Sequence, residues 1–301
     1  MRRARAGMNS NATQKGITMT KTSRYPRSWE WPGKANIAIS INLAFEAFHL
    51  HSQVTLEKSP NKADLFSLSY AEYGAKAGAW RVLDLLDDLG LKGSMSTNGL
   101  AAERYPNVMR SVADAGHEAV GHGWANDEIM KDDDPDAELA EIRRVTRILT
   151  ETTGVAPVGW TSPGSAGSAN TLAFLRGEGY IWNGDDASDD LPFLRDTRNG
   201  PMVIMPRTNI PHNDYIMWVG AKNAPGVMWE GFKDSFDQLY GEGRNGSPKW
   251  TEITLHFHMA GRPTLIPTVR KCLEYAKQHE GVWFARKREI AEWTMKREGK
   301  G

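Results

Sequence analysis

The chain has 301 residues, of which 40% are apolar and 25% charged, the composition of a globular protein with a sizeable core. Basic and acidic side chains are equal in number, 37 of each, so the net charge provides no bulk attraction to nucleic acid. The longest nearly apolar run, 37–45, is about half the length of a membrane-spanning helix, and the single cysteine, Cys272, excludes an internal disulfide and any zinc site with two thiolates.

The N-terminal segment differs in composition from the rest of the chain. Residues 1–29 contain seven basic and no acidic side chains, and they lack the apolar run of a secretory signal. We expect a disordered basic tail at 1–28, because low hydrophobicity with unopposed charge does not compensate the entropy lost on ordering. A mitochondrial presequence has a similar composition, and a start at Met8 or Met19 is a further alternative. The remaining residues, 29–301, are expected to form a single domain.

From residue 36 onward, short β-like runs alternate with longer helical runs whose apolar residues recur every three or four positions. Strands are predicted at 36–44, 93–97, 117–121, 157–160, 180–183, 202–205, 251–256 and 282–284. Helices are predicted at 72–89, 101–115, 136–153, 168–178, 268–279 and from Arg286. This alternation predicts a parallel α/β sheet that closes into a (β/α) barrel, with a doubly wound open sheet as the alternative. The loops 47–70 and 207–250 show no pattern that predicts their structure.

Polar side chains gather where the predicted strands end. In a parallel barrel the catalytic residues lie at the C-terminal ends of the strands. Glu46 directly follows the first strand, His122 the third, and His256 ends the seventh. Six of the eight histidines lie at or after such ends, namely His49, His51, His122, His212, His256 and His258. We therefore expect the functional site at this end of the barrel.

Several stretches near these residues resemble, in the same order along the chain, the polysaccharide deacetylase superfamily (NodB-like, carbohydrate esterase 4), and in particular its allantoinase-like and cyclic-imidase-like branch. The stretches are AGHEAVGHGW at 115–124, PVGWTSP at 157–163, DDLP at 189–192, LHFHMAGRP at 255–263 and GVWF at 281–284. The resemblance covers roughly residues 29–297. It implies a single-domain, distorted (β/α)7–8 barrel of the NodB type and hydrolysis of a non-peptide amide bond.

The resemblance also implies a metal site, which this sequence only partly retains. Members of the family use an Asp after the first strand and a His-x3-His pair after the third; here Glu46, His122 and Asn126 stand at those positions. An alanine replaces the usual aspartate base, and Thr161 replaces the arginine that orients it. Because a catalytic zinc needs three good protein ligands, we expect either no metal or a weakly bound divalent cation such as zinc. Asp127 or His49 would be an alternative third ligand.

Without strong help from a metal, amide hydrolysis needs a base for water and a donor for the oxyanion. We predict that Glu46, His122 and His256 are the catalytic residues, with Glu46 as the base. The predicted substrate-binding residues are Trp124, Trp160, Thr161, His258 and Arg262. The two tryptophans would stack on a planar ring, although large aromatic residues are mostly core residues. Arg262 would bind an anionic group or simply stiffen a turn.

These features together predict a hydrolase that cleaves a carbon–nitrogen bond in a small cyclic amide, imide or ureide. One alternative is a zinc-dependent N-deacetylase of sugars or peptidoglycan. Another is a catalytically inactive barrel that binds a ligand. The expected partner is a small-molecule substrate rather than nucleic acid or a membrane, and we expect a cytoplasmic homo-oligomer.

Overall fold

The computed structural model describes residues 25, 27–54, 61–207 and 212–299. The predicted disordered tail, 1–28, lies almost entirely outside these residues. No helix of the described part is long and apolar enough to cross a membrane. The predicted homo-oligomer and cytoplasmic location stay predictions.

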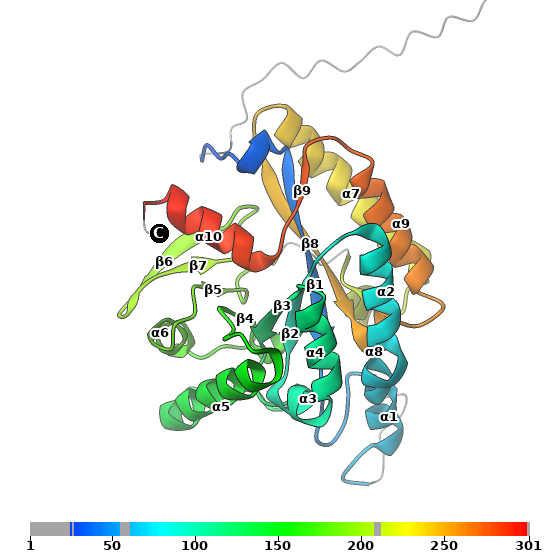
Figure 1. The fold of residues 1–301 in the computed structure, drawn as a ribbon, viewed down its shortest axis with the longest axis vertical. Coiled ribbons are helices and arrows are strands. Elements are labelled where there is room, and N and C mark those ends of the chain that lie inside the picture. The colour runs from blue at the N-terminus through cyan, green and yellow to red at the C-terminus, as the bar shows by residue number, and fades with distance from the viewer. Residues whose placement is uncertain (1–24, 26, 55–60, 208–211, 300–301) are drawn as a thin grey trace, which may run out of the picture.

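The strands of the described residues form one curled sheet, in the order β6-β7-β5-β4-β3-β2-β1-β8, and β9 also pairs with β1 (Figure 1). All neighbouring strands are parallel except β6 and β7, which form an antiparallel hairpin. The predicted distorted (β/α) barrel is thus confirmed, with the hairpin at one edge of the sheet. The strands are β1 (Ile37–Phe45), β2 (Ser94–Thr97), β3 (Glu118–Gly121), β4 (Gly159–Trp160), β5 (Trp182–Asn183), β6 (Phe193–Thr197), β7 (Gly200–Ile204), β8 (Lys249–His256) and β9 (Val282–Phe284).

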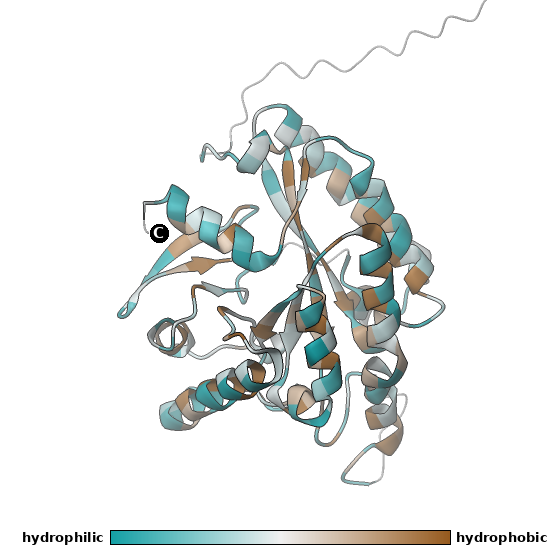
Figure 2. Ribbon diagram, in the orientation of Figure 1, coloured by the Kyte–Doolittle hydropathy of each residue, from teal (hydrophilic) through white to brown (hydrophobic). Residues whose placement is uncertain are grey.

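Helices cover the outside of this sheet, and Figure 2 shows their apolar residues mainly on the sides that face it. Helix α2 is typical, since its buried residues recur at three- and four-residue steps and it ends at Gly90, which has a positive φ. The helices are α1 (Leu65–Tyr73), α2 (Ala79–Leu89), α3 (Gly99–Arg104), α4 (Pro106–Asp114), α5 (Pro135–Thr153), α6 (Thr171–Gly177), α7 (Pro225–Arg244), α8 (Phe257–Ala260), α9 (Ile266–Lys277) and α10 (Lys287–Arg297). Two π-helical segments occupy Gly74–Gly78 and Tyr215–Gly220.

One predicted helix is divided in the structure, and one strand and one helix were not predicted. The helix predicted at 101–115 is two helices, because Pro106 cannot continue α3 and instead begins α4. Strand β6 was not predicted, because its side chains are only partly buried and show no apolar alternation. Helix α7 was not predicted either, since it contains glycines that weaken the helical pattern. One of them, Gly243, is required by packing, because a Cβ there would lie 1.9 Å from the carbonyl oxygen of Asn36.

Strand β1 is buried on both faces, and its two sets of side chains have different roles. Ile41 and Leu43 belong to the main hydrophobic cluster beneath the helices. Asn42, Ala44 and Glu46 alternate with them and line a cavity inside the barrel. Strand β8 adds Thr254 and His256 to the same cavity, in parallel register with Asn42 and Ala44 respectively. The alternation along β1 therefore places polar side chains inside the barrel, even though the sequence of this strand is almost continuously apolar.

Candidate active site

A cavity of about 450 Å³ lies at the C-terminal ends of strands β1, β3, β4 and β8 and extends into the barrel. It contains all three predicted catalytic residues. The polar side chains that line it come from at least six elements and the loops between them, so the fold assembles the site from distant parts of the sequence. They are Asn42, Glu46, Gln53, Ser96, His122, Asn126, Thr161, Ser165, Arg207, Asn213, Tyr215, Thr254, His256 and Lys287.

Glu46 is at the centre of the site and is 7% exposed. Its Oε1 atom lies 3.6 Å from Nε2 of His122 and 3.5 Å from Nε2 of His256. Its Oε2 atom accepts a hydrogen bond of 2.7 Å from Nε2 of Gln53. The structure therefore brings the three predicted catalytic residues together, with the carboxylate between the two imidazoles.

His122 follows β3 and is oriented by the residue that follows β4. Its Nδ1 lies 2.6 Å from the carbonyl oxygen of Thr161 and 3.0 Å from Oγ1 of the same residue. Because a carbonyl oxygen only accepts, Nδ1 carries a proton and Nε2 is the atom that faces Glu46. Thr161 thus lines the cavity and also fixes the ring of His122.

His256 is oriented by Asp214, a residue that the sequence did not single out. Oδ1 of Asp214 lies 2.6 Å from Nδ1 of His256, while Oδ2 accepts from the backbone N–H groups of His256 and Ala260 at 2.8 and 3.1 Å. Asp214 is completely buried. It holds Nε2 of His256 toward Glu46. Its segment precedes β8 by more than thirty residues, and a bridge between Asn213 and Thr254 helps to place it here.

The electrostatics of this group favour an ion pair. Burial opposes a charge on His256, but the carboxylates of Asp214 and Glu46 outweigh it and raise the pKa of His256 to about 10. Burial alone would raise the pKa of Glu46, but the charge of His256 and hydrogen bonds from both histidines lower it well below its usual value. At neutral pH Glu46 is therefore a carboxylate that can accept a proton, and His256 is an imidazolium that can donate one.

The two predicted ring-stacking residues belong to the core, which corrects that prediction. Trp124 packs against Gly99, and the guanidinium of Arg144 lies 3.2 Å from its ring centroid. Trp160 is fully buried and packs against Gly121. Neither lines the cavity. The glycines leave space that the rings fill, so these tryptophans mark close packing near the site and not a binding surface.

His258 and Arg262 also lie outside the cavity, contrary to the prediction. The His258 ring is buried against His256, with ring centroids 5.8 Å apart, and burial lowers its pKa to about 3. The guanidinium of Arg262 stacks on Tyr70 and Tyr73, at 3.7 and 4.1 Å from their ring centroids. It also donates to the carbonyl of His258. Arg262 therefore stiffens this turn, and His258 packs against His256 outside the cavity.

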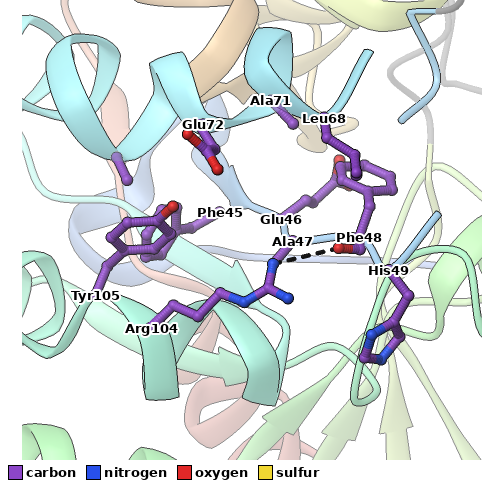
Figure 3. A pocket seen from close by; sticks show the side chains of 11 residues that line it. Phe45, Glu46, Ala47, Phe48, His49, Leu68, Ala71, Glu72, Arg104 and Tyr105 are labelled. Carbon is purple, nitrogen blue, oxygen red and sulfur yellow. Dashed lines mark hydrogen bonds between the residues drawn. The ribbon is translucent and has the colours of Figure 1, made fainter. Parts of the chain in front are cut away.

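The segment that carries Glu46 is fixed from outside the cavity. Both carboxylate oxygens of Asp127 accept from the backbone N–H of His49, and one also accepts from Leu50. Figure 3 shows this segment along a second cavity of about 220 Å³, where Arg104 donates to the carbonyl of Phe48. The His49 ring pairs instead with Glu128, at 3.2 Å. The structure therefore does not support Asp127 or His49 as a metal ligand. The Asp127 carboxylate anchors the backbone, and the His49 ring pairs with Glu128.

The predicted metal ligands are a poor donor set for a catalytic zinc. His122 and Glu46 face each other, but both carboxylate oxygens of Glu46 are already engaged, one by the two imidazoles and the other by Gln53. Asn126 offers a neutral amide oxygen, a weak ligand for zinc. Within the described residues, no group of three or more His, Cys, Asp or Glu is arranged to hold a metal ion. The residues present do not fit a resident catalytic zinc.

Comparisons with known proteins agree with this fold. The family model described as Polysaccharide deacetylase matches residues 60–181. A probable polysaccharide deacetylase from Pseudomonas aeruginosa PAO1 is 30% identical, covers 92% of this chain and 96% of its own, and superposes with a TM-score of 0.82. The structure of Puue allantoinase is also 30% identical, with a TM-score of 0.81 and the same shares, 92% and 96%.

A Schizosaccharomyces pombe protein described as "Putative polysaccharide deacetylase" is 25% identical over 302 residues, which cover 88% of this chain and 92% of that protein. The likeness therefore extends over nearly the whole length of each protein. With its distorted barrel and its 30% identity to two solved structures, the chain belongs to the polysaccharide deacetylase (NodB-like, carbohydrate esterase 4) family.

Proposed function

We propose that this protein hydrolyses a carbon–nitrogen bond of a small cyclic amide, imide or ureide. The observation that carries the proposal is the Glu46 carboxylate, which faces Nε2 of both His122 and His256 at 3.5–3.6 Å within a cavity of about 450 Å³. A buried carboxylate beside an imidazolium provides both a base and an acid for amide hydrolysis. The likeness to a structure named allantoinase supports a ring amide as substrate.

In the proposed reaction, Glu46 removes a proton from a water molecule while the water oxygen attacks the amide carbonyl carbon. The Nε2–H of His256 donates to the oxyanion that develops and then transfers its proton to the leaving nitrogen as the carbon–nitrogen bond breaks. The proton on Glu46 then returns His256 to its charged form. Addition of one water thus opens the ring to a carboxylic acid and an amino or amide group. Nε2 of His122, which faces Glu46 at 3.6 Å, helps to position the attacking water beside the carboxylate.

The main alternative is a metal-dependent N-deacetylase of sugars or peptidoglycan, which the descriptions of two similar proteins favour. The donor set around Glu46 and His122 supports it less well, because Asn126 replaces an imidazole. An inactive ligand-binding barrel is the other alternative.

Assays of the purified protein with succinimide, dihydrouracil, hydantoin and N-acetylglucosamine oligomers distinguish these functions. Chromatography would follow ring opening and acetate release. We expect ring opening and no acetate release. Acetate release that depends on added zinc would favour the deacetylase, and a lack of turnover with every compound would favour the inactive barrel.

A further inference from the structure

The cavity extends well below the catalytic residues. Along β1 it is lined by Glu46, Ala44 and Asn42 in turn, and at a rise of about 3.3 Å per residue Asn42 lies ~13 Å from Glu46 along the strand. Lys287, the first residue of α10, also lines the cavity at this deeper level. The cavity therefore has a reacting end at Glu46 and a second polar end, which the proposed hydrolysis does not use.

Lys287 is held firmly at the deep end. Its side chain is 2% exposed, and Nζ lies 2.6 Å from Oε2 of Glu252, whose side chain is 1% exposed. Nζ also donates to Oδ1 of Asn42 at 3.1 Å. The backbone N–H of Lys287 donates to Oγ of Ser94, which fixes the start of the helix. An ammonium group placed by three elements of the barrel is preorganised for binding.

A chain of hydrogen bonds connects this end of the cavity to His122. Nδ1 of His122 lies 3.0 Å from Oγ1 of Thr161, which donates to Oγ of Ser96 at 3.0 Å, and Ser96 donates to Asn42 at 3.1 Å. The hydroxyl groups of Thr161 and Ser96 therefore already have hydrogen-bond partners within the protein. An ammonium group has three N–H donors, and oxygen atoms of the described residues engage two of those of Lys287. Nζ also lies 5.4 Å from the ring centroid of Trp182, a weak contact that leaves the third donor available to an oxygen of a ligand.

The charges indicate which ligand group fits. Lys287 and Glu252 neutralise each other, so a carboxylate at this depth would be buried beside Glu252 without a compensating charge, which is costly. A neutral carbonyl oxygen accepts a hydrogen bond from the ammonium without adding charge.

We infer that Lys287 binds a neutral carbonyl group on an arm of the substrate, a carboxamide or ureide that extends down the barrel while the ring amide reacts at Glu46. This inference rests on the proposed function, and it makes Lys287 a specificity-determining residue. A ring amide with a carbonyl-bearing arm would be preferred over a bare ring, over an apolar arm and over an acidic arm.

Calorimetric binding to the Glu46→Gln variant tests this inference without turnover. The probes are three hydantoins that carry at carbon 5 a carboxamidomethyl, a carboxymethyl or an isobutyl arm; the first and third have nearly the same shape. The variant to compare is Lys287→Met/Glu252→Met, which removes both charges and leaves no unpaired ion in the core. Lys249→Met is the matched control, because Lys249 is an equally buried lysine that bonds Ser247 and does not line the cavity.

With Lys287 present, the carboxamide should bind more tightly than the carboxylate and the isobutyl arm. The double variant should reduce the carboxamide-to-isobutyl ratio of affinities by about 10- to 100-fold, the loss expected for one hydrogen bond to a charged donor. Lys249→Met should leave this ratio unchanged. An unchanged ratio in the double variant, or no binding of the carboxamide, would overturn the inference. Binding as expected, with no hydrolysis of these probes by the wild type, would overturn the proposed function alone.

Discussion

Oδ1 of Asp214 lies 2.6 Å from Nδ1 of His256, and both groups are buried at the end of β8. This contact fixes which ring nitrogen faces Glu46 and stabilises the charged imidazole. Asp214→Asn would keep an oxygen for the backbone donors but would remove the negative charge. We expect kcat to fall by about 10²- to 10⁴-fold with little change in KM, by analogy with other carboxylate–histidine pairs. Steady-state kinetics on a ring amide would measure this loss, and a variant with wild-type kcat would contradict the assigned role of Asp214.

The base is tested by Glu46→Gln, which preserves shape but cannot accept a proton from water. We expect kcat to fall by at least about 10²-fold while the far-ultraviolet circular dichroism spectrum stays unchanged. Glu72→Gln is the matched control, since Glu72 lines the neighbouring cavity and pairs with Lys76. Equal losses in both variants would show that the effect does not come from the proposed base.

The pH dependence of kcat/KM follows from the charges of the catalytic pair. The pKa of Glu46 is well below its usual value, and that of His256 is about 10. Glu46 must be ionised and His256 protonated, so activity is retained above the first pKa and lost as pH rises through the second. We expect a level profile from about pH 6 to pH 9, with an alkaline limb near pH 10. Asp214→Asn should move this limb to lower pH, and an alkaline limb that does not move would contradict the assignment to His256.

Stability below neutral pH should depend on His212. Burial, opposed by the charge of Glu252, lowers the pKa of His212 from 6.5 to about 4. The unfolded chain therefore binds more protons between these values, and the folded state loses stability as pH falls below about 6.5. His212→Met should remove this loss. Relative to the wild type, its free energy of unfolding should gain about 2 kcal/mol between pH 7 and pH 5.

Denaturant unfolding at both pH values would measure this difference. The control is His51→Gln at an exposed histidine, which should leave the pH dependence unchanged. If His212→Met has the same pH dependence as the wild type, His212 is not the group responsible.

Removal of divalent cations should leave the ring-opening activity intact. Glu46, His122 and Asn126 form a poor donor set for zinc, and both oxygens of Glu46 have partners within the protein. We therefore expect kcat after dialysis against a chelator to lie within about twofold of its starting value, and metal analysis to find less than one zinc per chain. Loss of activity that zinc restores would contradict this expectation.

Local sequence patterns predicted much of the fold and three residues of the site. The apolar run of β1, followed at once by Glu46, indicates a buried strand whose end carries a functional group. The same reasoning placed His122 and His256 at strand ends, and the family resemblance singled them out. The sequence could not show whether Trp124 and Trp160 are core residues or binding residues. A tryptophan next to a functional motif has the same sequence pattern whether its ring fills the core or lines a cavity. Only the positions of Gly99 and Gly121 beneath the rings decided between the two.

The amino-acid sequence by itself determined the alternation of strands and helices and the residue types at the strand ends, because both depend on periodicity and on chain direction. Tertiary structure alone decided which distant groups complete the site. Asp214 reaches His256 from a segment without a sequence pattern, and Lys287 enters the barrel from the first turn of the last helix. Such contacts arise from how helices and loops pack around a curled sheet, and no local pattern along the chain records them.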